Sequence, residues 1–134
     1  MAGYSGTPLA NKLGIKPGFT VFLIDAPKDY RDWLGELTDV KFVTKPSKGG
    51  ADAVHLFVTA LAEFDRQLPS ARKAMKSDGM LWVSWYKKSA KIPTDVTEDT
   101  IRDRALKTDL VDVKVCAVTE EWSGLKLVLR KALR

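Results

Sequence analysis

The chain has 134 residues, of which 45% are apolar and 29% charged, the proportions of one ordinary globular domain. Its single cysteine, Cys116, excludes an intrachain disulfide, and the apolar neighbours of Cys116 favour a buried thiol in a reducing compartment. No apolar run approaches the roughly 20 residues of a membrane span, and the first residues lack the pattern of a signal peptide. We therefore expect a soluble, cytoplasmic protein in which residues 1–134 form one domain and residues 1–14 a helical lead-in.

The net charge is +5, from 22 basic and 17 acidic residues. The basic residues are spread along the chain, apart from three lysines within residues 87–91 and three basic residues within 130–134. Nucleic-acid-binding proteins more often gather basic residues into a stripe with stacking aromatics. The charge therefore favours an anionic partner only weakly. Nucleic-acid binding is the less favoured alternative, no membrane partner is expected, and the oligomeric state is open.

The first predicted elements are a short helix and a strand. Thr7 would cap the helix, Pro8 would occupy its first position and Gly14 would end it. After a turn at residues 16–18, residues 20–25 (TVFLID) form an almost continuous apolar run. Such a run is typical of a central strand that is covered on both faces.

The middle of the chain alternates helices and strands. A weak amphipathic helix is predicted over residues 28–35, and the alternating residues 40–44 indicate an edge strand. Residues 53–59 form a second apolar strand. Apolar residues then recur at helical spacing, with Pro69 predicting a kink or two abutting helices and Gly79 the end of the helix.

The last part of the chain predicts three strands and one helix. Residues 80–85 (MLWVSW) form a strand, a lysine-rich loop follows, and Asp95 with Glu98 predicts a capped helix through about residue 107. The strands at residues 112–118 and 125–131 are joined by too few residues for a crossover helix. They therefore form an antiparallel hairpin, with a turn in which Gly124 would take a positive φ.

This order of elements resembles that of class I S-adenosylmethionine-dependent methyltransferases. Residues 14–25 (GIKPGFTVFLID), 51–57 (ADAVHLF) and 75–84 (MKSDGMLWVS) are similar to the segments that lead into three of that family's strands. The resemblance implies a three-layer, Rossmann-like α/β fold with a mostly parallel sheet of about six strands and a C-terminal antiparallel hairpin. The chain also resembles a family of small uncharacterised bacterial proteins, through residues 3–10, 81–85, 93–98, 113–118 and 122–128.

One departure bears on the cofactor. A methyltransferase needs a glycine-rich turn after its first strand, so that the backbone can approach the cofactor closely. Here residues 25–30 (DAPKDY) contain no glycine, and the second strand ends in Val43, Thr44 and Lys45 rather than in the acidic residue that would bind the ribose. We therefore expect no cofactor and no conventional methyl transfer.

Candidate binding residues follow from the rule that open α/β sheets bind ligands at the carboxyl ends of their strands. The residues selected in this way are Asp25, Ser84, Trp85, Lys87, Lys88, Asp95 and Trp122. Aromatic side chains beside lysines could hold a phosphate or carboxylate. A solvated lysine loop and a tryptophan packed over the core are the simpler explanations.

No catalytic set is evident. His55, the only histidine, is better explained as a hydrogen-bonded core residue than as a general base. Asp95, Glu98 and Asp99 are better explained by helix capping than by a metal, and one cysteine with one histidine cannot form a structural zinc site. These residues favour a non-catalytic binding or regulatory module. An enzyme whose Lys87 or Lys88 holds a small anionic substrate is the alternative.

Overall fold

The computed structural model describes residues 8–134 of the chain. Two short 3₁₀ helices, Lys88–Ala90 and Lys131–Leu133, accompany the main elements. In chain order the main elements are α1 (Leu9–Leu13), β1 (Thr20–Ile24), α2 (Tyr30–Leu34), β2 (Lys41–Val43), β3 (Ala51–Phe57), α3 (Leu61–Ala74), β4 (Met75–Tyr86), α4 (Glu98–Ala105), β5 (Leu110–Ala117) and β6 (Trp122–Leu129).

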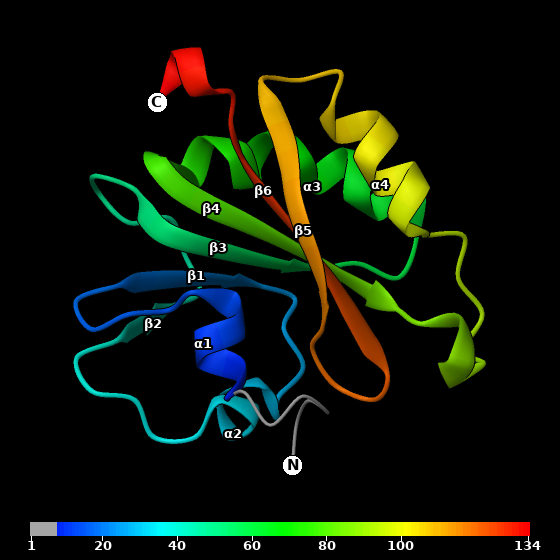
Figure 1. Ribbon diagram of the computed structural model, residues 1–134, viewed down its shortest axis with the longest axis horizontal. Coiled ribbons are helices and arrows are strands. Elements are labelled where there is room, and N and C mark those ends of the chain that lie inside the picture. Colours follow the sequence, from blue (N-terminus) through cyan, green and yellow to red (C-terminus); the bar gives the residue numbers. More distant parts are fainter. Residues whose placement is uncertain (1–7) are drawn as a thin grey trace.

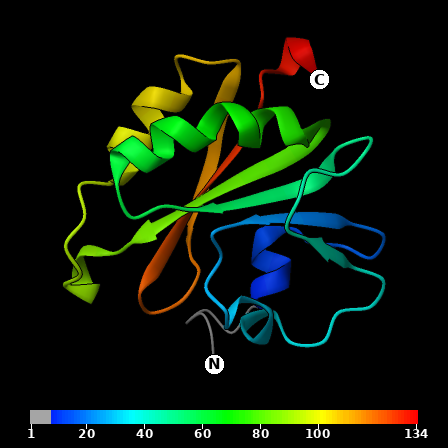
Figure 2. The ribbon, with the colours of Figure 1, turned by 180° about the vertical axis from the view of Figure 1, so that it is seen from behind.

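The strands form one six-stranded sheet in the order β2-β1-β3-β4-β6-β5. β1 to β4 are parallel to one another, and β6 is antiparallel to both of its neighbours, β4 and β5. Helices α3 and α4 cover one face of this sheet, and α1 and α2 lie on the other (Figures 1 and 2). The three-layer α/β fold, the edge position of β2 and the C-terminal hairpin are therefore confirmed.

Alternating residues of the strands fill two separate cores. In β3, Val54 and Leu56 belong to the cluster packed under α3 and α4, whereas Ala53 and Phe57 pack with α1 and α2. This alternation follows from the pleat of a strand, which sends successive side chains to opposite faces. The carboxyl ends of β1, β3 and β4 meet at one rim of the sheet, where a ligand is expected in open α/β folds.

Helix α3 begins as predicted but ends earlier. Its buried residues include Phe64, Leu68 and Ala71, so the helical spacing identified its inner face correctly, and Pro69 lies inside a single helix. The prediction that Gly79 ends the helix is wrong, because β4 starts directly at Met75. Gly79 instead lies where β4 crosses β3 closely: a Cβ there would be 2.9 Å from the carbonyl oxygen of Asp52.

The cap predicted for α4 is also wrong. The helix is capped by Thr97, whose side chain accepts a hydrogen bond from the Thr100 N–H, while the Thr100 hydroxyl accepts one from the Thr97 N–H. Asp95 lies two residues outside this cap. Its carboxylate accepts a hydrogen bond of 2.8 Å from the N–H of Leu61, the first residue of α3. At α1, the predicted end at Gly14 is confirmed, and Thr7 lies outside the described residues.

The hairpin turn is shorter than predicted. Trp122 and Gly124 belong to β6, and the turn is closed by the Val118 N–H, which donates to the Trp122 carbonyl at 2.9 Å. The predicted positive φ of Gly124 is wrong. Gly124 is required for packing, since a Cβ there would lie 3.0 Å from a methyl group of Val118 and 3.1 Å from the Trp82 ring.

Candidate functional site

The rim at the carboxyl ends of the strands contains two separate hollows. The first, here called the loop hollow, has a volume of about 670 Å³ and lies beside the segment that joins β4 to α4. The second, the β1 hollow, has a volume of about 650 Å³ and lies beyond the end of β1. The candidate residues divide between them: Trp85, Lys87 and Lys88 line the loop hollow, and Asp25 lines the β1 hollow.

The other candidates lie outside these hollows. Ser84 and Trp122 are buried, with 0% and 6% of their surface exposed. Asp95 fixes the start of α3 rather than facing either hollow, although its neighbour Thr94 lines the loop hollow. The sequence predicted one site at this rim. The structure instead places Asp25 in the β1 hollow and Lys87 and Lys88 in the loop hollow.

The loop around the first hollow is fastened at both ends. At its start, the Lys87 N–H donates to the Glu121 carbonyl of the hairpin turn at 2.8 Å. At its end, the Thr94 hydroxyl donates to the Thr59 carbonyl at 2.7 Å, and the carboxylate of Asp95 binds the Leu61 N–H. These bonds join the loop to two different connections of the sheet. A ligand here would meet a wall that is largely formed in advance, which reduces the entropic cost of binding.

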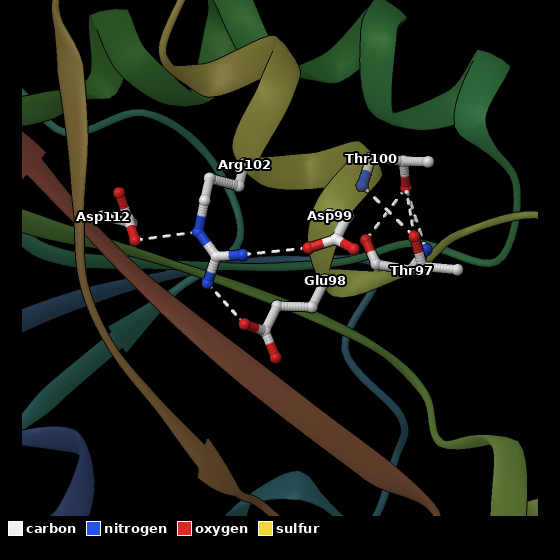
Figure 3. A network of polar contacts seen from close by, with 6 residues as sticks. All are labelled: Thr97, Glu98, Asp99, Thr100, Arg102 and Asp112. Atoms are coloured by element: carbon white, nitrogen blue, oxygen red, sulfur yellow. Dashed lines mark hydrogen bonds and ion pairs between the residues drawn. The ribbon is translucent and has the colours of Figure 1, made fainter.

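One wall of the loop hollow is acidic but compensated. Glu98 and Asp99, in the first turn of α4, both bind the guanidinium of Arg102, which also donates to Asp112 of β5 at 2.9 Å (Figure 3). The hydrogen bond that Arg102 donates to Glu98 is the main cause that raises the pKa of Arg102, so this side chain stays cationic. Lys87, Lys88 and Lys91 also line the loop hollow.

The acidic side chains of the loop hollow are thus paired with an arginine. Among residues 8–134, no ion pair joins Lys88 or Lys91 to a carboxylate. The first turn of α4 also contributes the positive end of its helix dipole to this hollow. Because Glu98 and Asp99 are held by Arg102 and lysines line the same hollow, the hollow offers cationic groups to a ligand that carries negative charge.

A polar group that the sequence reasoning did not assemble lies beneath the rim. His55 of β3 forms a hydrogen bond of 2.9 Å through Nδ1 with the Tyr30 hydroxyl, and one of 2.7 Å through Nε2 with the Ser84 hydroxyl. All three side chains are at most 1% exposed. Burial lowers the pKa of His55 to about 3 and raises that of Tyr30, so both are neutral at pH 7. The interpretation of His55 as a hydrogen-bonded core residue is confirmed.

The rim above β1 does not fit a cofactor held by a glycine-rich turn. Asp25 takes a positive φ of 57°, a conformation that glycine adopts more easily, and no glycine follows before α2. The Tyr30 ring packs edge-on against Phe57, with ring centres 5.6 Å apart, and Phe57 in turn packs against Trp122 at 5.0 Å. Thr44, which follows β2, supplies no carboxylate for a ribose. The turn after β1 therefore lacks glycine, and the end of β2 lacks a carboxylate, as the sequence indicated.

The described part of the chain contains neither a cluster of metal ligands nor a membrane-spanning helix. Within residues 8–134, no group of three histidine, cysteine or acidic side chains could hold a metal ion. No helix in the same range is long and apolar enough to cross a membrane.

Several solved structures with the same fold are methyltransferases or are assigned as such. A protein from Sulfolobus solfataricus assigned as a type 11 methyltransferase is 16% identical, with 98% of this chain and 95% of that one covered and a TM-score of 0.64. A protein from Thermoplasma acidophilum assigned as a methyltransferase is 8% identical, with coverages of 99% and 78% and a TM-score of 0.57. The tRNA methyltransferase TrmK of B. subtilis is 13% identical, with coverages of 97% and 68% and a TM-score of 0.55.

At such identities the likeness extends to the fold alone. No curated protein matches the chain. A family model matches residues 10–131, which is nearly the whole chain. The chain therefore belongs to the family described as "Protein of unknown function (DUF3052)".

Proposed function

We propose that this protein is a non-catalytic binding module that takes a small anionic ligand into the loop hollow. The observation that carries the proposal is the charge arrangement of that hollow. Three lysines line it, while its carboxylates, Glu98 and Asp99, are engaged by Arg102. Ammonium groups beside half-buried aromatic surface are suited to a phosphate or a carboxylate.

The interior supports binding rather than acid–base chemistry. The one imidazole of the chain is buried between Tyr30 and Ser84 and remains neutral, so it supplies no proton acceptor to the rim. In the loop hollow a base would have to be a lysine or a carboxylate, and Glu98 and Asp99 are occupied by Arg102. We also propose that the module works in the bacterial cytoplasm and without S-adenosylmethionine, since the turn after β1 contains no glycine.

Isothermal titration calorimetry of the full chain tests this function. The probes are inorganic phosphate, pyrophosphate and citrate, with S-adenosylmethionine as a further probe. We expect heat of binding from at least one of the three anions and none from S-adenosylmethionine. Changing Lys88 and Lys91 together to glutamine should weaken the anion about ten-fold or more, because charge-assisted hydrogen bonds contribute about 1.5–3 kcal/mol each.

The matched control changes Lys45 and Lys48 together to glutamine. It removes the same charge from an exposed loop outside the loop hollow and should leave binding unchanged. Equal weakening by both pairs would reduce the effect to net charge and contradict a site in the hollow. Tight binding of S-adenosylmethionine would contradict the proposal that the scaffold has lost its cofactor.

A further inference from the structure

The face of the sheet that carries α1 and α2 is incompletely covered. Figure 1 looks onto this face and shows no helix of the described chain over β5 and β6, whereas α3 passes behind them and α4 lies beside β5. The exposure of β6 reflects the difference: Leu125 and Leu127 point towards α4 and are fully buried, whereas Lys126 and Val128 on the open face are half-buried.

Two lysines face each other across this open surface. Lys114 of β5 and Lys126 of β6 are direct cross-strand neighbours, since the register pairs them. Like charges in this position are destabilising, because their side chains project side by side from the same face. The Lys114 ammonium also lies 6.0 Å from the centre of the Trp82 ring, which anchors it over the sheet.

Further lysines come to the same surface from other segments. The Trp82 indole N–H donates to the Leu13 carbonyl at 2.9 Å, and this bond fixes the end of α1 beside β4. Lys12 precedes that carbonyl and Lys16 follows it. Lys16 and Lys114 both help to lower the pKa of Lys126, after burial, so the three ammonium groups repel one another across this face.

Cys116 marks the centre of the group. It is half-buried rather than buried as predicted, because no helix covers this part of β5. Burial is the main cause that raises the pKa of its thiol, and the ammonium groups of Lys12, Lys114 and Lys87 oppose that rise. Four lysines from separate parts of the sequence are thus gathered beside β5 and β6, and we call this group the lysine face: Lys12, Lys16, Lys114 and Lys126.

The surroundings of the lysine face indicate the chemistry of its partner. Within residues 8–134, none of Lys12, Lys16, Lys114 and Lys126 forms an ion pair with a carboxylate. The exposed large apolar residues of the described chain are Leu106, Val113, Val115 and Leu133, and none belongs to this cluster. A bilayer would require apolar side chains to insert beside the cations. A chain of regularly repeated negative charge needs only the cations.

An aromatic side chain extends the same surface. Tyr86, at the end of β4, is half-buried and stacks on Trp122 with ring centres 4.0 Å apart, next to Lys87. Basic residues interleaved with aromatic rings are typical of surfaces that follow a nucleic-acid backbone. We propose that the lysine face binds the phosphodiester backbone of a nucleic acid.

Fluorescence anisotropy with the full chain tests the proposal. The probes are labelled mixed-sequence single-stranded RNA, single-stranded DNA and duplex DNA, titrated at low and at physiological salt. We expect binding to at least one of them that weakens steeply with salt, because each phosphate contact releases a counterion. Changing Lys114 and Lys126 together to glutamine should weaken that binding by on the order of ten-fold and flatten its salt dependence.

The control changes Lys73 and Lys107 together to glutamine, which removes two exposed charges from the α3 and α4 layer. It should retain the wild-type affinity, and a thermal melt of both variants checks that each is folded. Absence of binding to all three nucleic acids, or equal weakening by the control pair, would overturn the proposal. So would binding to phosphatidylserine vesicles without binding to nucleic acid. Lys114 and Lys126 lie outside the loop hollow, so anion binding there remains a separate measurement.

Discussion

The two faces of the sheet handle charge in opposite ways. On the face covered by α3 and α4, arginines pair with carboxylates from other elements: Arg72 with Asp109 at 2.9 Å and Arg104 with Asp65 at 2.7 Å. On the other face, the polar group around His55 is fully enclosed, and Lys12, Lys16, Lys114 and Lys126 form no ion pair with a carboxylate among the described residues.

The charges of the α3 and α4 layer are paired within the fold, whereas those of the lysine face are available to a partner. Ion pairs join α3, α4 and β5, so the arginines of that layer already have carboxylate partners and are less available to bind a ligand. The cations Lys12, Lys16, Lys114 and Lys126 form no ion pair within the described chain, and Lys114 and Lys126 repel each other. A local arrangement that opposes stability is expected where function requires it. This contrast can be tested from the interior outwards.

The largest effect is expected from His55→Leu. Leucine fills a similar volume but leaves the hydroxyls of Tyr30 and Ser84 buried without their partner. Each orphaned hydroxyl costs about 1–3 kcal/mol, so the free energy of unfolding should fall by about 3 kcal/mol. Urea unfolding followed by circular dichroism measures this loss.

A triple variant separates the hydrogen bonds from packing. Combining Tyr30→Phe, His55→Leu and Ser84→Ala removes the whole polar group and should restore most of the stability lost in His55→Leu. Leu56→Met, a buried change on the opposite face, should cost under about 1.5 kcal/mol. A triple variant less stable than His55→Leu would show that these three residues act through shape rather than through hydrogen bonding.

A smaller effect is expected from acid. The folded pKa of His55, about 3, lies below the ordinary value of 6.5, so between these values the unfolded chain binds one proton more than the folded one. Stability from this group is therefore complete above about pH 6.5 and is lost as the pH falls towards 3. The loss should approach 1.4 kcal/mol per pH unit and reach about 2 kcal/mol at pH 5.

The triple variant again provides the comparison. Carboxylates also titrate in acid: the pKa of Asp52 is lowered by the Thr20 N–H and then by Lys76, and that of Asp109 by Arg72. Both groups destabilise the wild type and the triple variant equally. Subtracting the triple variant's profile of unfolding free energy against pH from the profile of the wild type therefore isolates the contribution of His55. A flat difference between pH 4 and 6.5 would mean that the imidazole is protonated in the folded protein.

The strands were predictable because each is a local property of the chain. Apolar runs such as residues 20–25 gave the central strands, and the short link after β5 required a hairpin. Their ends were less predictable. Trp122 and Gly124 have the composition of a turn, but hydrogen bonds to Val118 and pairing with β4 extend the strand through them.

The sites depended on distances that the sequence does not contain. Asp95 has a capping residue's chemistry, yet its partner is the N–H of Leu61, 34 positions earlier. The contacts of His55 come from residues 25 and 29 positions away. The lysines of the lysine face span residues 12 to 126, so a chain with evenly spread charge forms a concentrated cationic surface only after folding.

The smallest expected effect tests that surface directly. Lys126→Gln removes the repulsion from Lys114 and Lys16 while leaving Lys114 over Trp82. Relief of one cross-strand like-charge pair should raise the free energy of unfolding by about 0.5 kcal/mol at low salt, and screening should remove most of the gain at high salt. Lys73→Gln, on the opposite layer, should change stability by less.

Urea unfolding of the wild type, Lys126→Gln and Lys73→Gln at low and at high salt tests this prediction. A loss of stability in Lys126→Gln would mean that this side chain supports the fold through its aliphatic stem, which half-buried lysines can do. A gain in the free energy of unfolding that disappears at high salt would mean that the charge of Lys126 destabilises the folded protein. The open face would then be maintained at the expense of stability, as expected of a surface whose cations are completed by a partner.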